Sequence, residues 1–250
     1  MLNVNISKIR KLSKKIGGIR AVRNCSFEIK KNSIVAVIGP NGAGKSTLFN
    51  LISGVIREDR GKIFFKGIDI TKFNPAKRSN LGISRLFQRT QLFKNLTVRE
   101  NLILAIDNED TKFWKNIFGK NKLTKEKEKK VKEALKLIEM GDFENIIGRD
   151  LSYGQIRLVE FARTVLNPHE LLILDEPVAG LNPRLRNKIA ERLKRLKREG
   201  KTILLIEHDM DFALNLADEV IVLDKGFLIA RGTSSKIRQN KKVLNAYLGD

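Results

Sequence analysis

The sequence lacks several features that define other classes of protein. It has one cysteine, Cys25, so it can form no intramolecular disulfide and has no cysteine cluster to bind a metal. No apolar run approaches the roughly 20 residues that a membrane-spanning helix needs. Residues 1–15, MLNVNISKIRKLSKK, contain no uninterrupted apolar stretch typical of a secretory signal. We therefore expect a soluble chain that faces the cytosol, with Cys25 in a buried strand.

Acidic residues are scarce relative to basic ones. The chain has 28 Asp and Glu against 49 Lys and Arg, which gives a formal net charge of +21. Such a charge favours nucleic acid, anionic membrane surfaces or acidic partners. The basic residues are distributed, however, and are not interleaved with aromatic residues as in proteins that stack single-stranded bases. We interpret the charge as a lysine-rich solvated surface and expect no nucleic-acid partner.

Short strands alternate with helices along most of the chain. Hydrophobic residues make up 42% and charged residues 31%, which is a globular composition. Apolar runs that end in turn residues predict strands, and amphipathic spacing predicts helices. We expect strands at residues 2–7, 24–29, 33–39, 61–67, 83–88, 171–177, 202–209, 219–223 and 227–232, and helices at 44–54, 152–166 and 184–200. This order predicts an α/β fold with a mostly parallel core sheet covered on both faces.

A helical segment interrupts this alternation. Two sets of apolar residues each share one helix face: Val131, Ala134, Leu135 and Ile138 in the first, and Leu158, Val159, Ala162, Val165 and Leu166 in the second. No internal repeat or low-complexity linker divides the sequence. We expect a single domain over residues 1–250. Residues 1–90 and 167–250 would form the α/β core with a C-terminal tail, and residues 91–166 a helical subdomain.

The segment GPNGAGKST, residues 39–47, matches the phosphate-binding pattern G-x-x-x-x-G-K-[ST] at every fixed position. A β-rich run precedes it and a helix follows, as that pattern requires. The glycines let successive backbone N–H groups turn toward phosphate oxygens, and the helix start adds a positive dipole end. Lys45 can reach the β- and γ-phosphates, and the Ser46 hydroxyl can bind Mg²⁺. The residues expected to contact ATP are Gly39, Pro40, Asn41, Gly42, Ala43, Gly44, Lys45, Ser46 and Thr47.

Polar side chains follow three other predicted strands. Asp175 and Glu176 end the run LLILDE, His208 follows TILLIE, and Gln88 ends ISRLFQ. Open α/β sheets bind ligands at the carboxyl ends of their strands, so we expect these residues near the phosphates. Asp175 would hold Mg²⁺, and Glu176 would act as general base toward water. His208 would lie near the γ-phosphate or the water, and Gln88 would contact Mg²⁺ and the water.

The order of these motifs resembles the ATPase cassette of ABC transporters. GPNGAGKST, Gln88, LSYGQ (151–155), LLILDEP, AGLN (179–182) and His208 follow one another as in that family over nearly the whole chain. The resemblance implies an α/β P-loop NTPase of the ABC cassette type. Such a fold has a mostly parallel core sheet, an N-terminal antiparallel β portion and an inserted helical subdomain. It also implies that two cassettes close head to tail over two ATP molecules, so that Ser152, Gly154 and Gln155 would contact ATP held by the partner.

Two residues depart from the usual family pattern. Tyr153 stands in LSYGQ where a glycine is usual, and this variant resembles the LivG-type subunits of branched-chain amino-acid importers. The segments IGGIRAV, AGLNP, TILLIEHDM and AYLGD resemble the same subgroup. Ile16 occupies the position of an aromatic residue that stacks on adenine in the family. We expect Ile16 to contact the nucleotide through apolar packing without ring stacking.

The resemblance implies an ATP-hydrolysing subunit that powers an importer of branched-chain or other hydrophobic amino acids. Its partners would be a second ABC ATPase subunit, two membrane permease subunits and an extracytoplasmic solute-binding protein. The chain would lie peripherally on the cytoplasmic face of the membrane. Two alternatives stay open. The first is a non-transport ABC ATPase acting on nucleic acid or ribosomes, which the net charge of +21 motivates. The second is the ATPase of a lipid or polysaccharide exporter.

Overall fold

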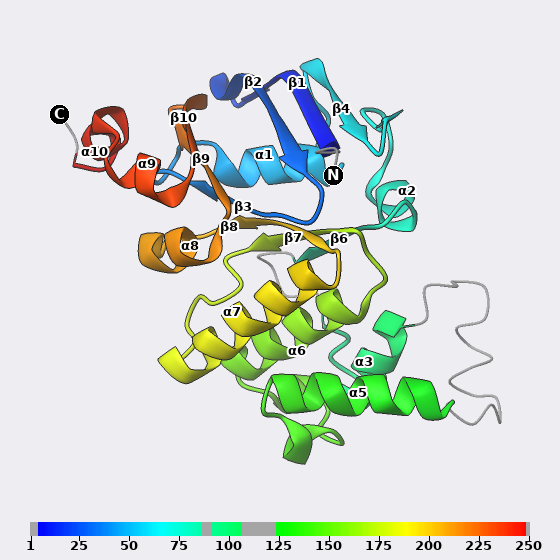
Figure 1. Ribbon diagram of the computed structural model, residues 1–250. Helices are drawn as coiled ribbons and strands as arrows, with labels where there is room; N and C mark the ends of the chain where they lie inside the picture. Colours follow the sequence, from blue (N-terminus) through cyan, green and yellow to red (C-terminus); the bar gives the residue numbers. More distant parts are fainter. Residues whose placement is uncertain (1–4, 87–91, 107–123, 249–250) are drawn as a thin grey trace. The chain divides into compact units, whose positions relative to one another are not determined.

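A computed structural model describes residues 5–86, 92–106 and 124–248 (Figure 1). The chain divides into two compact units. The first comprises Met1–Arg85, Glu170–Glu176 and Arg192–Asp250, and the second comprises Leu86–His169 and Pro177–Glu191. Within the described ranges, no helix is both long and apolar enough to cross a bilayer.

The first unit opens with an antiparallel sheet of four strands. Their order is β2 (Ile19–Lys30), β1 (Asn5–Ile16), β4 (Arg60–Phe65) and β5 (Ile68–Asp69). β1 and β2 are 12 residues each and form a long hairpin, whereas the sequence predicted only residues 2–7 and 24–29. The pairing of β1 with β2 contains several register shifts, and Lys11 has a φ of 47°. These bulges break the two-residue alternation by which a strand is recognised in a sequence.

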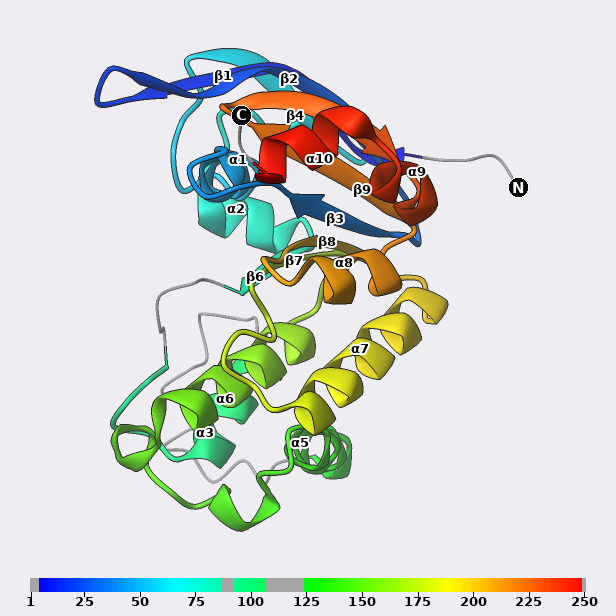
Figure 2. The same cartoon turned by 90° about the vertical axis from the view of Figure 1, so that its left-hand side faces the viewer.

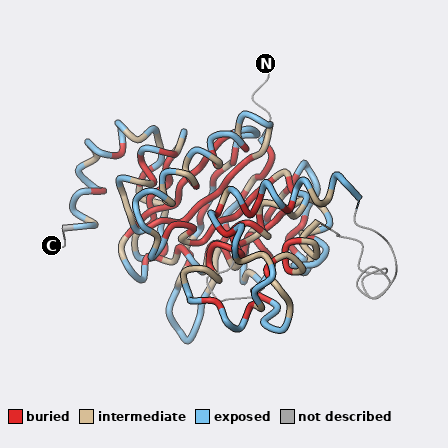
Figure 3. The backbone as a smooth tube through the Cα atoms, turned by 90° about the horizontal axis from the view of Figure 1, so that it is seen from below, coloured by how far each residue is buried: buried red, intermediate tan, exposed pale blue. Residues whose placement is uncertain are grey.

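The core sheet of this unit has six strands, and its central part is parallel as predicted. The order is β10 (Phe227–Gly232), β9 (Glu219–Asp224), β3 (Ile34–Ile38), β8 (Thr202–Ile206), β7 (Leu171–Asp175) and β6 (Ile83–Leu86). Strands β9, β3, β8 and β7 pair in parallel, and β10 is antiparallel to β9. Every residue of β3, β7 and β8 is buried, in keeping with their continuous apolar sequences. Buried backbone is drawn red in Figure 3.

Helices cover both faces of the core sheet. Helix α1 (Lys45–Ile52) lies between the two sheets (Figure 1), where Leu48, Phe49 and Leu51 join their apolar core. Helix α8 (Met210–Leu216) packs against β3. Asp209 is its N-cap, and the Asp209 side chain accepts a hydrogen bond from the Phe212 N–H. Helices α9 (Ser234–Arg238) and α10 (Lys241–Leu248) lie beside β10 (Figure 2). The short helix α2 (Pro75–Asn80) follows β5 in the chain.

The second unit is helical, as its apolar periodicity predicted. It contains α3 (Val98–Ile106), α5 (Lys125–Leu137) and α6 (Tyr153–Leu166), with single 3₁₀ turns at Gly141–Phe143 and Gly148–Asp150. Helix α7 (Pro183–Arg198) begins in this unit and ends in the first. The predicted face of α5 and the residue after it is confirmed, because Val131, Ala134, Leu135 and Ile138 are all buried. On α6, Leu158, Val159 and Ala162 are buried, and Val165 and Leu166 are half-buried.

Candidate active site

The phosphate-loop sequence connects β3 to α1, which is the context predicted for it. Two of its glycines are required by close backbone approach. A Cβ atom on Gly39 would stand 2.1 Å from the carbonyl oxygen of Leu223, and one on Gly44 would stand 2.0 Å from that of Ala21. Both glycines also have positive φ, 149° and 97°. The loop is therefore pressed between β2 and β9, and only glycine fits at these two positions.

Lys45 opens α1 with its side chain buried to 5% exposure. Its Nζ atom donates hydrogen bonds to the carbonyl oxygens of Gly39, at 2.7 Å, and Pro40, at 2.9 Å. Burial lowers the pKa of Lys45, while the charges of Glu176 and Asp175 oppose that shift. The ammonium group and the two carboxylates therefore act on one another within a single site. Ser46 follows Lys45 in the first turn of α1 and is exposed.

The parallel pairing of β7 and β8 brings Glu176 and His208 together. Asp175 lies opposite Ile206 in the register, so the residues that follow the two strands meet at the same edge of the sheet. The Nε2 atom of His208 lies 2.9 Å from Oε1 of Glu176. The Glu176 side chain is 19% exposed and that of His208 is 49% exposed, so solvent can reach the pair. The structure therefore brings two of the predicted site residues together at one edge of the sheet.

Glu176 has an unusual backbone conformation. Its φ is 52°, in the left-handed region that non-glycine residues seldom adopt, and its N–H donates to the carbonyl oxygen of Ile206 at 3.0 Å. That hydrogen bond extends the pairing of β7 with β8 by one residue, to Glu176, where the chain leaves the sheet. Strained residues of this kind cluster at functional sites, which fits the role predicted for this carboxylate.

Asp175 ends β7 with 1% exposure. The Nη2 atom of Arg85, in β6, lies 3.4 Å from its Oδ2 atom. Burial lowers the pKa of Arg85, and the Asp175 charge opposes that shift. Arg85 is not among the site residues predicted from the sequence, although a charged residue inside the predicted apolar strand ISRLFQ was a signal that could have found it.

The residues present fit a nucleotide with Mg²⁺. Among the described residues, no group of three or more His, Cys, Asp or Glu side chains is placed to hold a metal ion. The predicted donors are instead one buried carboxylate, Asp175, one hydroxyl, Ser46, and Gln88, which lies outside the described residues. Mg²⁺ is commonly held by one or two carboxylates together with the phosphates of a substrate. The buried ammonium of Lys45 and the tightly packed loop glycines suit phosphate oxygens.

The predicted partner-facing residues begin α6, in the second unit. Ser152 is the N-cap, and its Oγ accepts a hydrogen bond from the Gln155 N–H at 3.4 Å. The Gln155 side chain in turn accepts one from the Ser152 N–H at 2.8 Å, which completes a capping box. A Cβ atom on Gly154 would meet nothing within 4 Å. Tyr153 is 67% exposed, so the residue that departs from the usual signature does not fill the core.

Two predicted site residues, Ile16 and Gln88, remain. Ile16 ends β1, pairs with Ile19 across the hairpin turn and is 50% exposed. Gln88 lies outside the described residues. His169, the second histidine, is 5% exposed, and its Nδ1 lies 2.6 Å from the Asn167 carbonyl oxygen, which marks a structural residue.

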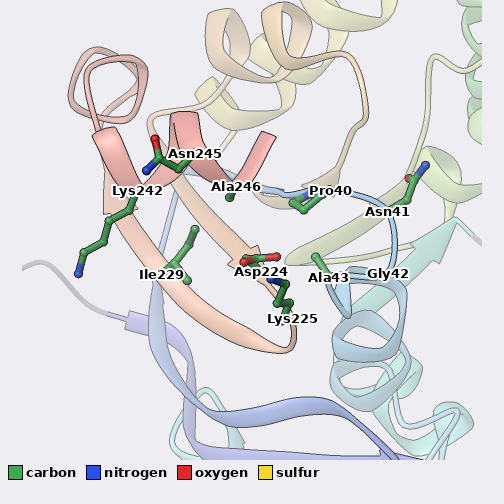
Figure 4. Close-up of a pocket in the computed structure, with 10 residues that line it drawn as sticks. All are labelled: Pro40, Asn41, Gly42, Ala43, Asp224, Lys225, Ile229, Lys242, Asn245 and Ala246. Atoms are coloured by element: carbon green, nitrogen blue, oxygen red, sulfur yellow. The ribbon is translucent and has the colours of Figure 1, made fainter. Parts of the chain in front are cut away.

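A pocket of about 550 Å³ adjoins the phosphate loop (Figure 4). The loop, the β9–β10 hairpin and α10 line it with Pro40, Asn41, Gly42, Ala43, Asp224, Lys225, Ile229, Lys242, Asn245 and Ala246. The next residue of α10, Tyr247, makes a hydrogen bond with the Gly39 backbone, while burial raises the pKa of its phenol. The C-terminal helix therefore contacts the first residue of the phosphate loop, which the sequence did not indicate.

The fold and site agree with a comparison to known families. The family model described as ABC transporter matches residues 22–179. The chain therefore belongs to the ABC transporter family.

Full-length relatives narrow this to the LivG type, as the sequence predicted. The chain is 39% identical to an Archaeoglobus fulgidus protein named "Probable branched-chain amino acid transport ATP-binding protein LivG", over 98% of this chain and 96% of that protein. It resembles the ADP conformation of an ATP-binding cassette of an ABC transporter, with a TM-score of 0.80, 33% identity and coverage of 99% and 100%. It also resembles a dimeric cassette bound to ADP and Pi in a post-hydrolysis state, with a TM-score of 0.78, 27% identity and coverage of 91% and 98%.

Proposed function

We propose that this chain is the ATP-hydrolysing subunit of an ABC importer for branched-chain or other hydrophobic amino acids. The observation that carries the hydrolytic role is the pairing of Glu176 with His208 at the carboxyl edge of the parallel sheet, where Glu176 also acts on the buried Lys45. A general base, a cationic phosphate ligand and a histidine at one sheet edge are the parts that phosphoryl transfer to water needs. The amino-acid substrate is inferred from the name of the Archaeoglobus fulgidus relative.

In the proposed reaction, the oxygen of a water molecule bonds to the γ-phosphorus of ATP. The bond to the β–γ bridging oxygen breaks in line with the attack, and ADP and phosphate leave. Glu176 accepts a proton from the water, and His208 orients the water or a γ-phosphate oxygen. Residues 39–47 hold the phosphates, and Ile16 packs on the base. Mg²⁺, held by Ser46, Gln88 and Asp175, would neutralise charge on the phosphates.

Two cassettes are proposed to share each ATP. Ser152, Gly154 and Gln155 at the start of α6 would contact the nucleotide held by the phosphate loop of the partner. The helix start supplies backbone N–H groups and a positive dipole end, both of which favour a γ-phosphate. The dimeric cassette with ADP and Pi that this chain resembles supports a two-cassette arrangement.

The rest of the proposed assembly lies in other chains. Two membrane permeases would form the transport path, and an extracytoplasmic binding protein would deliver the solute. This chain would bind the permeases from the cytoplasmic face of the membrane. ATP-driven closure of the two cassettes would move the helical unit and the permease docked on it.

The test is capture of the assembly from the cells that produce the chain. Tagged Glu176→Gln protein would be purified in mild detergent with ATP, and the co-purifying proteins identified by mass spectrometry. We expect two polytopic permeases and a second cassette. Ribosomal proteins or nuclease-sensitive nucleic acid without a membrane partner would contradict transport, and would favour a function based on the net charge of +21. Permeases known to export lipid or polysaccharide would contradict the amino-acid substrate.

A further inference from the structure

We infer that Arg85 is a positioning residue for the Mg²⁺ site, because it joins the two elements from which Ser46 and Asp175 are presented. Arg85 lies in β6, Asp175 ends β7, and Ser46 belongs to the first turn of α1. The inference rests on the proposed function, since it concerns the metal site of that reaction. It assigns a role to a residue outside the phosphate loop and the strand-end cluster.

One guanidinium group makes both connections. Nη2 of Arg85 contacts Oδ2 of Asp175 at 3.4 Å, and Nη1 donates to Oγ of Ser53 at 2.5 Å. Ser53 is the C-cap residue of α1, and its hydroxyl donates to the Phe49 carbonyl oxygen at 2.8 Å. Arg85 therefore ties the end of the phosphate-loop helix to the carboxylate at the end of β7.

The burial of these groups makes their arrangement well defined. The side chains of Arg85 and Asp175 are 6% and 1% exposed, and Ser53 is 5% exposed. A buried charge is tolerated only with a counter-charge or hydrogen bonds, so neither member of the pair can swing away cheaply. The contact to Oδ2 restricts rotation of the carboxylate and so limits the directions open to its other oxygen, Oδ1.

An arginine is suited to this task in a way that a lysine is not. Its planar guanidinium carries several N–H donors at fixed angles, so one side chain can bridge Ser53 and Asp175. A lysine has a single ammonium on a flexible chain. It would preserve the charge beside Asp175 without holding both groups in one geometry. Partners that orient a metal-binding carboxylate commonly change metal affinity about 10- to 100-fold when removed.

A second buried arginine in the same unit provides a matched control. Arg78 is 1% exposed and also holds the end of α1, through hydrogen bonds from Nη1 to the carbonyl oxygens of Leu51 and Ile52. Arg78 also donates hydrogen bonds to the Thr71 and Phe73 carbonyl oxygens. Arg78 and Arg85 therefore share burial and contact with α1, and Arg85 in addition contacts Asp175.

The experiment measures ADP binding by titration calorimetry across a range of Mg²⁺ concentrations and in EDTA. The proteins are the wild type, Arg85→Lys, Ser53→Ala and Arg78→Lys, each checked by its melting temperature. For Arg85→Lys we expect the Mg²⁺ concentration that half-maximally strengthens ADP binding to rise about tenfold or more. We expect binding in EDTA to be unchanged. Ser53→Ala, which removes no charge, shifts the Mg²⁺ requirement in the same direction by less.

Arg78→Lys lowers the melting temperature and leaves the Mg²⁺ requirement at the wild-type value. Suppose that ADP binding to the wild type responds to Mg²⁺, but that Arg85→Lys and Ser53→Ala need no more Mg²⁺ than the wild type. That result overturns the inference and leaves the proposed function standing. An equal rise in Arg78→Lys also overturns the inference, because the effect would then be a general consequence of loosening α1. If ADP binding to the wild type does not respond to Mg²⁺, the proposed function fails and the inference fails with it.

Discussion

The Nε2 atom of His208 lies 2.9 Å from Oε1 of Glu176, although the two residues follow different strands. The parallel register of β7 with β8 produces this contact, because Asp175 is level with Ile206 and both chains then continue past the same sheet edge. Two polar groups that meet in this way can act on one water molecule. Their energetic effects should also depend on each other.

Glu176→Gln should hydrolyse ATP at least about tenfold more slowly than the wild type while still binding it, because the amide cannot accept the proton of the attacking water. The rate is measured as phosphate release at saturating ATP, and binding as a nucleotide titration. The control is Glu170→Gln, which removes a surface carboxylate paired with Lys66 just before β7. Undiminished turnover in Glu176→Gln would remove that residue from its role as base.

His208→Ala should lower kcat by about 10- to 100-fold with little change in KM, because the histidine is proposed to orient groups during the chemical step. The double variant with Glu176→Gln should be little slower than Glu176→Gln alone, since we propose that the two side chains act on the same water. Steady-state kinetics of the wild type, the two single variants and the double variant complete this double-mutant cycle. Fully multiplicative losses would show that the two residues act independently.

Gly44→Ala should destabilise the protein by about 3 kcal/mol and abolish nucleotide binding, because the added methyl group meets the Ala21 carbonyl in a strained backbone. The matched control is Gly67→Ala. Gly67 also has positive φ, 80°, but a Cβ there meets nothing within 4 Å. Its cost should be about 1 kcal/mol, with binding intact. Urea unfolding gives the free energy of unfolding of both variants. Equal losses of stability would contradict the close approach at Gly44.

Ile16→Phe should tighten ATP binding by about two- to tenfold, because a ring at the exposed end of β1 can stack on adenine. Tripolyphosphate, which has no base, is the control ligand and should bind both proteins equally. The measurement is a titration of each ligand into wild type and variant. Unchanged or weaker ATP binding would show that Ile16 does not lie against the base.

Cys25 should react with a thiol reagent only when the first unit opens. It is 1% exposed in β2, its Sγ lies 3.5 Å from the Gly226 carbonyl oxygen, and burial raises its pKa. Both burial and a low thiolate fraction slow the reaction at neutral pH. Labelling in the native state should follow the unfolding rate, and ATP should slow it. Rapid labelling without denaturant would contradict the burial of this strand.

The sign of the pH dependence follows from the raised pKa of Cys25. The unfolded thiol loses its proton near pH 8.5, before the buried one does. Above that pH the unfolded state binds fewer protons than the folded state, so this group reduces stability as pH rises. A Cys25→Ala variant should lack that component. Melting temperatures measured between pH 7 and pH 10 test the difference.

The core of the fold could be predicted because its signals are local. β3, β7 and β8 are continuous apolar strands, and the chemically informative residues Gly39, Asp175 and His208 lie at or just after their carboxyl ends. Parallel sheets place such ends together. The hairpin of β1 and β2 was underestimated because bulges break its alternation. Lysines also interrupt the apolar residues of this hairpin, although Leu12 and Ile9 are buried there.

The contacts of Arg85 and Tyr247 could not be predicted for a different reason. Arg85 reaches Asp175 and Ser53 across three elements, and Tyr247 reaches Gly39 from the far end of the chain. Side-chain reach and packing decide such contacts, and no short-range periodicity records them. The capping box of Ser152 and Gln155 is an intermediate case, because it has a local sequence signal that was not used. Its spacing was visible in LSYGQ, but we assigned those residues only to the nucleotide.

The left-handed backbone of Glu176 has a consequence for how variants at this position will behave. A side chain in that conformation costs about 1–2 kcal/mol, which glycine avoids and asparagine reduces. Selection for thermal tolerance alone would therefore favour replacing the residue proposed as the base. Variants that gain stability at position 176 are expected to be inactive, so resistance to heat and turnover are opposed at this one site.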